Sequence, residues 1–285
     1  MKQASVLILL LASLCSCTSK PLPLNVMTFN IRYDNSGDRV NSWQHRKDVA
    51  AEVVMECDVD LLGTQEVLAN QLHDLKERLH PYAAVGVGRA DGREAGEYAA
   101  IFYKKEKFEA EKSGNFWLSE TPEIAGSKGW DGACERMATW VILKEKKTGK
   151  RLFFINTHLD HVGTAARREG VKLLLERAKA ESRGLPVIIT GDFNASPQSE
   201  VIRQVLAGGE FFDARQLAPS VAEAGGTFHG FGEVPAEKRS TIDYVFVTGS
   251  VSVKTYLTLP EKRNGIFLSD HTPVLVKVDV GGGFD

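Results

Sequence analysis

Short apolar runs rich in valine and isoleucine recur along the chain, each bounded by turn-forming residues. Runs this short are typical of buried β-strands rather than helices. They are Leu24 to Ile31, Val59 to Gly63, Ala99 to Tyr103, Met137 to Leu143, Leu152 to Asn156, Pro186 to Thr190, Ile242 to Val247 and Pro273 to Val278. A chain with so many buried strands must fold around sheets.

Helical patterns lie between some of these runs: Arg46 to Glu56, Ala69 to Leu79, Ala165 to Ala180 and Ser199 to Leu206. Helices and strands alternate near both ends of the chain, while the middle reads as consecutive strands, which predicts a mixed α/β fold. The basic stretch Lys144 to Arg151 joins two runs, and we interpret it as a solvated hairpin turn around Thr148-Gly149 rather than a phosphate-binding patch.

The first residues resemble a bacterial export signal that is too short to span a membrane. Leu14-Cys15-Ser16-Cys17 resembles a lipobox, so we predict a lipoprotein signal peptide over residues 1–16, lipid attachment at Cys17 and a tether over 17–23. Secretion without a lipid is the alternative. The domain is expected over 24–280, with a loose tail at 281–285. No acidic run follows Cys17, which favours the periplasmic face.

The composition argues against sequence-independent binding of nucleic acid, and it leaves open whether the cysteines form a disulfide. The signal removes one of 35 basic residues against 37 acidic ones, so the mature chain lacks the positive charge of a sequence-independent nucleic-acid binder. About 265 residues suffice for one domain with its own core. Cys57 and Cys134 could form a disulfide after export, but we favour two separate buried thiols.

Polar residues follow several of the predicted strands at the point where each strand ends. They are Asn30, Glu66, His158, the pair Asp192 and Asn194, and Asp270-His271 just before the last run. Each alone could be a turn residue, a helix cap or a buried histidine. Together they provide oxygen ligands for Mg²⁺ or Mn²⁺, an acid/base carboxylate and neutral donors for a phosphoryl group. The sequence thus predicts hydrolysis of a phosphate ester.

Six motifs occur in an order that resembles one family. They are Met27-Thr28-Phe29-Asn30-Ile31-Arg32, Gly63-Thr64-Gln65-Glu66-Val67, Asn156-Thr157-His158-Leu159-Asp160, Thr190-Gly191-Asp192-Phe193-Asn194-Ala195, Ser240-Thr241-Ile242-Asp243-Tyr244-Val245 and Leu268-Ser269-Asp270-His271-Thr272-Pro273. They resemble the endonuclease/exonuclease/phosphatase superfamily. The segments between the motifs resemble a bacterial branch of it that is distantly similar to deadenylases. The resemblance implies a DNase I-like, four-layer α/β/β/α sandwich.

The resemblance also implies roles for the motif residues. Glu66 looks like the main metal ligand, with Asn30 and Asp270 beside it. Asp192 looks like the base that activates water, Asn194 and His158 like donors to phosphate oxygens, and His271 like a phosphate-contacting histidine oriented by Asp243. The base could instead be His271. Asp160-His161 beside His158 lacks the closed ligand set that zinc requires.

Loops between the motifs contain candidate substrate contacts. Arg89, Arg136 and Arg167 are candidates for a second phosphate or a polar substrate body, although arginines also serve on surfaces and as caps of a core. Trp117, Trp130, Phe228 and Phe231, with His229 in the same segment, could contact a base or a sugar, or simply pack under the loops. The substrate predictions are Arg89, Trp117, Arg136, Arg167, Phe228 and His229.

These observations leave three functions open. The first is a metal-dependent phosphodiesterase or phosphatase acting on a phosphorylated small molecule. The second is an endonuclease or 3′–5′ exonuclease on DNA or RNA, suggested by the deadenylase kinship. The third is a lipoprotein that binds a ligand without catalysis. The presence of all the expected catalytic residues argues against it: Glu66, Asp192, Asn194, Asp243 and His271.

Overall fold

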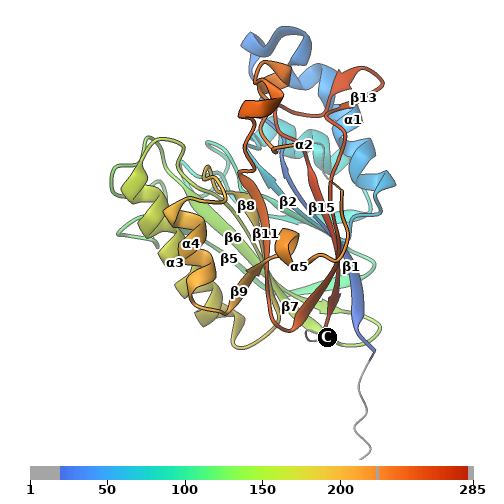
Figure 1. Cartoon of the computed structure of the whole chain (residues 1–285), viewed down its shortest axis with the longest axis vertical. Helices are drawn as coiled ribbons and strands as arrows, with labels where there is room; N and C mark the ends of the chain where they lie inside the picture. The colour runs from blue at the N-terminus through green and yellow to red at the C-terminus, as the bar shows by residue number, and fades with distance from the viewer. Residues whose placement is uncertain (1–19, 223–224, 282–285) are drawn as a thin grey trace, which may run out of the picture.

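The computed structural model describes residues 20–222 and 225–281 (Figure 1). The predicted signal peptide, Cys17 and residues 282–285 lie outside the described residues, so lipid attachment and periplasmic exposure stay predictions. The sequence predicts a tether that extends to Pro23, but Leu22 and Pro23 belong to the first strand, where they pair with Val280 and Asp279. No helix within the described ranges combines the length and the apolar character needed to cross a bilayer.

Two large sheets form the centre of the described structure. The seven-stranded sheet has the order β10 (Val221–Ala222), β12 (Val251–Thr258), β15 (Val274–Val280), β1 (Leu22–Asn30), β2 (Leu61–Gln65), β4 (Ile101–Lys104), β3 (Tyr82–Val85). The six-stranded sheet has the order β5 (Phe108–Trp117), β6 (Met137–Glu145), β7 (Arg151–His158), β8 (Val187–Asp192), β11 (Asp243–Thr248), β9 (Phe211–Asp213). A small hairpin pairs β13 (Lys262–Arg263) with β14 (Ile266–Phe267).

Helices cover the outer face of each sheet. Helices α1 (Trp43–Glu56) and α2 (Ala69–Arg78) pack on the seven-stranded sheet, and α3 (Thr164–Ser182) and α4 (Glu200–Ala207) pack on the six-stranded one (Figure 1). Helix α5 (Ala214–Leu217) and three short 3₁₀ segments, Ser36–Asn41, Gly230–Gly232 and Ala236–Lys238, lie in connections. The predicted four-layer α/β/β/α sandwich is confirmed.

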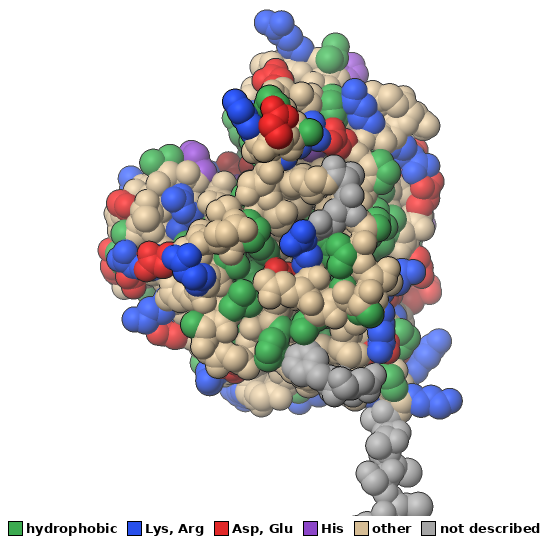
Figure 2. All heavy atoms as spheres, in the orientation of Figure 1, with side chains coloured by type: hydrophobic (Ala, Val, Ile, Leu, Met, Phe, Trp, Pro, Cys, Tyr) green, Lys and Arg blue, Asp and Glu red, His purple; other side chains and the backbone are tan. Residues whose placement is uncertain are grey.

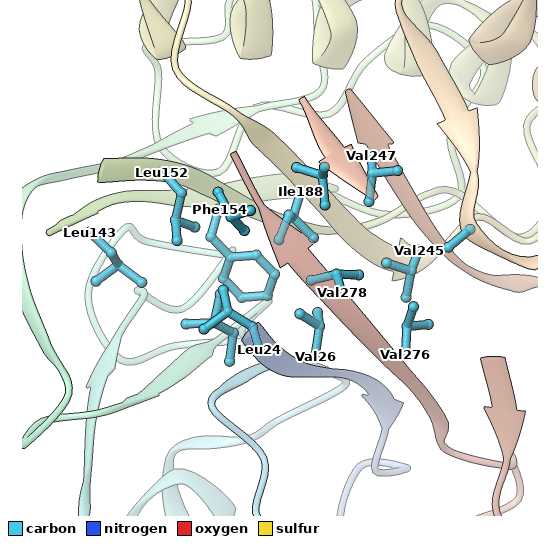
Figure 3. Packing of buried hydrophobic residues seen from close by; sticks show 14 of the residues in the cluster. Leu24, Val26, Leu143, Leu152, Phe154, Ile188, Val245, Val247, Val276 and Val278 are labelled. Atoms are coloured by element: carbon cyan, nitrogen blue, oxygen red, sulfur yellow. The ribbon is translucent and has the colours of Figure 1, made fainter. Parts of the chain in front are cut away.

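The layer between the sheets changes character along the strands. In β1, Leu24 and Val26 point into an apolar cluster between the sheets (Figure 3). Because side chains alternate, Asn30 shares their face at the end of the strand. Strand β8 repeats the pattern, with Ile188 in the cluster and Asp192 on the same face four residues later. One face therefore supplies the core at one end and polar groups at the other.

A buried polar network marks the transition. The Gln65 amide donates to Thr28 Oγ1 at 3.1 Å and to Asn156 Oδ1 at 2.7 Å, and Thr190 Oγ1 donates to Asn156 Oδ1 at 3.0 Å. Gly63 lets the sheets approach here, since a Cβ at this position would lie 2.1 Å from Thr190 Oγ1. The network holds the ends of β1, β2, β7 and β8 at a common level beneath a pocket.

All of the apolar runs form strands, and the four predicted helices are present with small shifts at their ends. The hairpin around Thr148-Gly149 is also confirmed: Glu145 Oε2 accepts hydrogen bonds from Thr148 N and Oγ1, both at 2.6 Å, and Gly149 has a φ of 73°. Several strands went unpredicted, chiefly β3, β5 and β12.

Candidate active site

The strand ends open into a pocket with a volume of about 410 Å³. Of the residues predicted to form the site, Glu66, His158, Asp192, Asn194, Asp270 and His271 line it. Asn30 and Asp243 lie directly beneath and bond to these residues. The structure therefore brings all of the predicted catalytic and metal-site side chains together.

Asp192 lies at the centre of the group and is buried. Its Oδ1 accepts from the backbone N–H of Asn194 at 2.9 Å, and its Oδ2 accepts from Asn30 Nδ2 at 3.0 Å. The turn is possible because Asn194 adopts a left-handed φ of 46°, which asparagine tolerates. Burial, and next the charge of Asp243, raises the pKa of Asp192 to about 7. A carboxyl group with such a pKa can exchange a proton near neutral pH.

His271 forms a buried dyad with Asp243. Its Nδ1 lies 2.9 Å from Asp243 Oδ2, and its Nε2 points toward Asp192 Oδ2 at 3.8 Å. Burial alone would lower the pKa of His271, but the carboxylates of Asp243, Asp192 and Asp270 outweigh it and raise the pKa well above its usual range. We infer an imidazolium that places a positive charge beside Asp192.

His158 differs from His271 in charge. Its Nε2 lies 3.1 Å from Asn194 Nδ2, and an amide nitrogen can only donate, so this Nε2 accepts and Nδ1 carries the proton. Burial, followed by the charges of Arg136 and Arg89, lowers the pKa of His158 well below its usual range. The pocket thus contains a neutral histidine on one side of Asp192 and a charged one on the other.

Glu66 and Asp270 form a candidate metal site. Glu66 accepts from Asn30 Nδ2 at 3.0 Å and from Tyr33 N at 3.1 Å. The Arg32 guanidinium lies 3.9 Å from Glu66 Oε2 and 3.8 Å from Asp270 Oδ2, so both carboxylates already face a cation. Burial raises the pKa of Asp270, and the charge of Glu66 adds to this effect. Carboxylate oxygens are hard ligands, so this pair fits Mg²⁺ or Mn²⁺.

Two details refine the predicted metal ligands. Asn30 Oδ1 accepts from the backbone N–H of Arg32 at 3.0 Å, while its Nδ2 orients Glu66 and Asp192; that Asn30 is a metal ligand stays a prediction. In addition, ligand atoms of Asp192, Asp243 and His271 all lie within 4.8 Å of one another, which makes a second acidic centre in the same pocket.

The predicted substrate residues divide into two groups. Arg89, Arg136 and Phe228 line the pocket. Trp117, Arg167 and His229 are not among its lining residues. The Trp117 indole donates to the carbonyl of Arg89 at 2.6 Å, and Arg167 Nη1 donates to the carbonyl of Asp160 at 2.9 Å. His229 is fully buried and stacks on Phe267. These three side chains support the loops and do not reach the pocket.

The pocket also has lining residues that the sequence did not predict as site residues: Arg32, Tyr33, Glu97, Cys134, His161 and Ile242. Arg32 lies within the first family motif and Ile242 within the fifth, and those positions were the available signal. Glu97 pairs with Arg89 through both carboxylate oxygens, at 2.6 and 2.8 Å. Nothing in the local sequence of Glu97 indicates this role, because the pair depends on how one loop folds.

Asp160 organises the wall beside His158. Its Oδ1 accepts from the backbone N–H groups of Val162 and Gly163, at 2.9 and 2.6 Å, and its Oδ2 accepts from Ala133 at 3.0 Å. Ligand atoms of Asp160, Cys134 and His161 lie within 4.8 Å of one another, but Arg136 Nε is 3.6 Å from Asp160 Oδ2. The Arg136 guanidinium thus already supplies a positive charge to the Asp160 carboxylate.

We expect Asp160→Asn to destabilise the protein in a pH-dependent manner. Burial would raise the pKa of Asp160, but the hydrogen bonds from Gly163, Val162 and Ala133 and the charge of Arg136 lower it to about 2. A lowered pKa stabilises the fold above about pH 4, and this contribution disappears between about pH 4 and pH 2. Urea unfolding should show a loss of about 2 kcal/mol at pH 7 and a much smaller one at pH 2.5. Equal losses would contradict the argument.

Cys57 and Cys134 are both free and only half-buried. The prediction of two separate thiols is confirmed, and each is partly rather than fully buried. Burial is the main cause that raises the pKa of each thiol. Both therefore stay protonated at neutral pH.

Comparisons with known proteins identify the family. Residues 27–271 match the Endonuclease/Exonuclease/phosphatase family. An endonuclease/exonuclease/phosphatase from Bacteroides vulgatus is 42% identical, with a TM-score of 0.89 over 91% of this chain and 99% of that one. The mannosyl-6-phosphatase of Bacteroides thetaiotaomicron is 38% identical, with a TM-score of 0.85 over 90% and 99%.

More distant relatives match the chain at lower sequence identity. The 3′–5′ exoribonuclease subunit Ccr4 of Mycosarcoma maydis is 23% identical over 90% of this chain and 50% of its own length. The chain therefore spans about half the length of the curated relatives it matches. The human Nocturnin catalytic domain is 21% identical, with a TM-score of 0.71 over 91% of this chain and 94% of that one, a likeness of fold alone. The chain therefore belongs to the endonuclease/exonuclease/phosphatase family, as the family match, the shared fold and the assembled motif residues together show.

Proposed function

We propose that this protein is a divalent-metal-dependent phosphatase that hydrolyses a small phosphomonoester of the sugar phosphate class. The observation that carries the proposal is the pocket of about 410 Å³, which is of the size that encloses a small ligand and contains Asp192, His271, Glu66 and Asp270 together. The likeness to the mannosyl-6-phosphatase, at 38% identity over nearly the full length of both chains, supports the choice of substrate class.

The charged and neutral groups have separate tasks in this proposal. Asp192 takes the proton of the attacking water, since its raised pKa suits proton transfer near neutral pH. The His271 imidazolium, held by Asp243, stabilises charge on the phosphoryl oxygens as they become more negative. Asn194 and His158 orient each other and form a neutral wall beside Asp192.

Glu66 and Asp270 would hold the divalent ion. The ion, when bound, would neutralise phosphate oxygens and help the leaving oxygen depart. Asn30 keeps the two halves of the site in register, because its amide donates both to Glu66 and to Asp192 at 3.0 Å. The same side chain therefore couples the position of the cation site to that of the proposed base.

The charge distribution favours a small substrate over a polymer. Each pocket arginine is matched by a carboxylate: Arg32 by Asp38, Arg89 by Glu97 and Arg136 by Asp160. On the face shown in Figure 2, lysines and arginines are interspersed with acidic side chains. A nuclease that follows a phosphate backbone needs a surplus of positive charge. The nuclease reading stays the second candidate because of the exoribonuclease relative.

The test is hydrolysis by the protein from Lys20 onward, with and without Mg²⁺ or Mn²⁺. The substrates are p-nitrophenyl phosphate, its bis ester, hexose phosphates, nucleotides and single-stranded RNA and DNA. We expect metal-dependent release of phosphate from hexose phosphates with a weak dependence on salt. Activity confined to oligonucleotides, falling steeply with added salt, would replace the proposal with the nuclease reading.

A further inference from the structure

One side of the pocket is formed by residues outside the catalytic motifs or without a proposed role in the reaction. We call Arg89, Glu97, Arg136 and His161 the distal wall. All four line the same pocket as Asp192 and His271. Their side chains form two linked pairs, Arg89 with Glu97 and Arg136 with His161, and each pair has a defined pattern of donors and acceptors.

Arg136 determines which ring nitrogen of His161 carries the proton. Arg136 is buried, and its Nη2 lies 2.9 Å from His161 Nδ1. A guanidinium can only donate, so His161 Nδ1 must be an acceptor and its proton must reside on Nε2. His161 is itself exposed at the pocket. Arg136 therefore holds the His161 ring with its Nε2–H donor directed away from the guanidinium.

The distal wall is close to neutral overall. Arg89 is bonded to Glu97 through two contacts, and Arg136 faces Asp160 at 3.6 Å. A second phosphate would meet no surplus positive charge here and would lie beside the Glu97 carboxylate. Hydroxyl groups fit better, because they can donate to a carboxylate oxygen and accept from an imidazole N–H at once.

The wall also lies at a suitable place relative to the reacting phosphate. The neutral His158 ring separates the two regions, with its Nε2 3.4 Å from Asp192 Oδ2 and its Nδ1 4.0 Å from Glu97 Oε2. If a phosphate binds at Asp192 and His271, only the His158 ring separates it from Glu97, so the rest of the substrate can lie near Glu97.

We infer that the distal wall recognises the hydroxyl groups of a sugar-like substrate, with His161 as the specificity-determining donor and Arg136 as the residue that positions it. The buried Nη1 of Arg136 has no hydrogen-bond partner among the described residues, so this guanidinium has a donor that remains unpaired within the distal wall. The inference rests on the proposed phosphatase function and deepens it, because it states how the substrate body is read.

The experiment compares two substrates in wild-type protein and in His161→Ala. We expect KM for hexose 6-phosphates to rise about tenfold, as for the loss of one good hydrogen bond, with kcat changed little. For p-nitrophenyl phosphate, which has no hydroxyl groups, KM should change less than twofold. His161→Gln keeps an N–H donor and should recover part of the loss. His73→Ala, on the exposed face of α2, is the matched control.

A second readout tests Arg136 without catalysis. In wild-type protein, ¹⁵N chemical shifts of His161 should report an Nε2–H tautomer, and Arg136→Met should shift the population toward Nδ1–H. If wild-type protein hydrolyses no phosphomonoester, the proposed function fails. If it hydrolyses hexose phosphates but His161→Ala leaves KM unchanged, or raises KM equally for both substrates, only the assignment of the distal wall is overturned.

Discussion

Asp192→Asn is expected to lower kcat at least about a hundredfold, the size usual for a lost acid/base group. The change keeps the shape of the side chain and an oxygen for the Asn194 N–H, at 2.9 Å in the native protein, but removes the group that accepts the proton of water. The measurement is phosphate release at saturating metal. Asp48→Asn, an exposed carboxylate of α1 that pairs with Arg78, controls for the loss of one charge.

His271→Ala provides the companion measurement. It removes the positive charge that Asp243 maintains and should also reduce turnover at least about a hundredfold, while leaving the base in place. Circular dichroism should show that both variants keep the native sheets. If both variants turned over at a near-normal rate, the proposed chemistry would be excluded.

The fold could be predicted where burial on both faces left continuous apolar runs. Strand β8 is such a case, since Val187 to Ile189 are all buried between two cores. Strand β5 was missed because it lies at the edge of its sheet and its Glu109 to Lys112 stretch is largely exposed, so its sequence lacks an apolar pattern. Edge strands are determined by pairing with a neighbour, which a local reading of sequence cannot detect.

The site followed a similar division. Asn30, Asp192 and His158 end strands that the core orients, so their convergence could be expected once the strands were recognised. Glu97 faces the pocket because its own loop folds back to pair it with Arg89, and His161 faces it through its contact with Arg136. Such contacts, one within a single loop and one between two segments 25 residues apart, leave no periodic signal in the sequence. The reaction class was therefore more accessible to prediction than the groups that contact the substrate body.

Glu66→Gln is expected to weaken binding of Mn²⁺ at least about tenfold, because even residues behind a metal ligand contribute that much to affinity. Glutamine keeps an oxygen for the Asn30 amide and the Tyr33 N–H but removes the charge that faces the cation. Electron paramagnetic resonance of free Mn²⁺ measures the affinity independently of turnover. Glu94→Gln, an exposed residue on a nearby loop, is the control for charge.

The result also distinguishes the two acidic centres of the pocket. If the metal binds between Glu66 and Asp270, Glu66→Gln should weaken it and Asp243→Asn should leave its affinity nearly unchanged. If Asp243→Asn has the larger effect, the ion instead occupies the centre formed by Asp192, Asp243 and His271, whose ligand atoms lie within 4.8 Å of one another. In that case His271 would be a metal ligand, and its role as a charged donor to the phosphate would have to be abandoned.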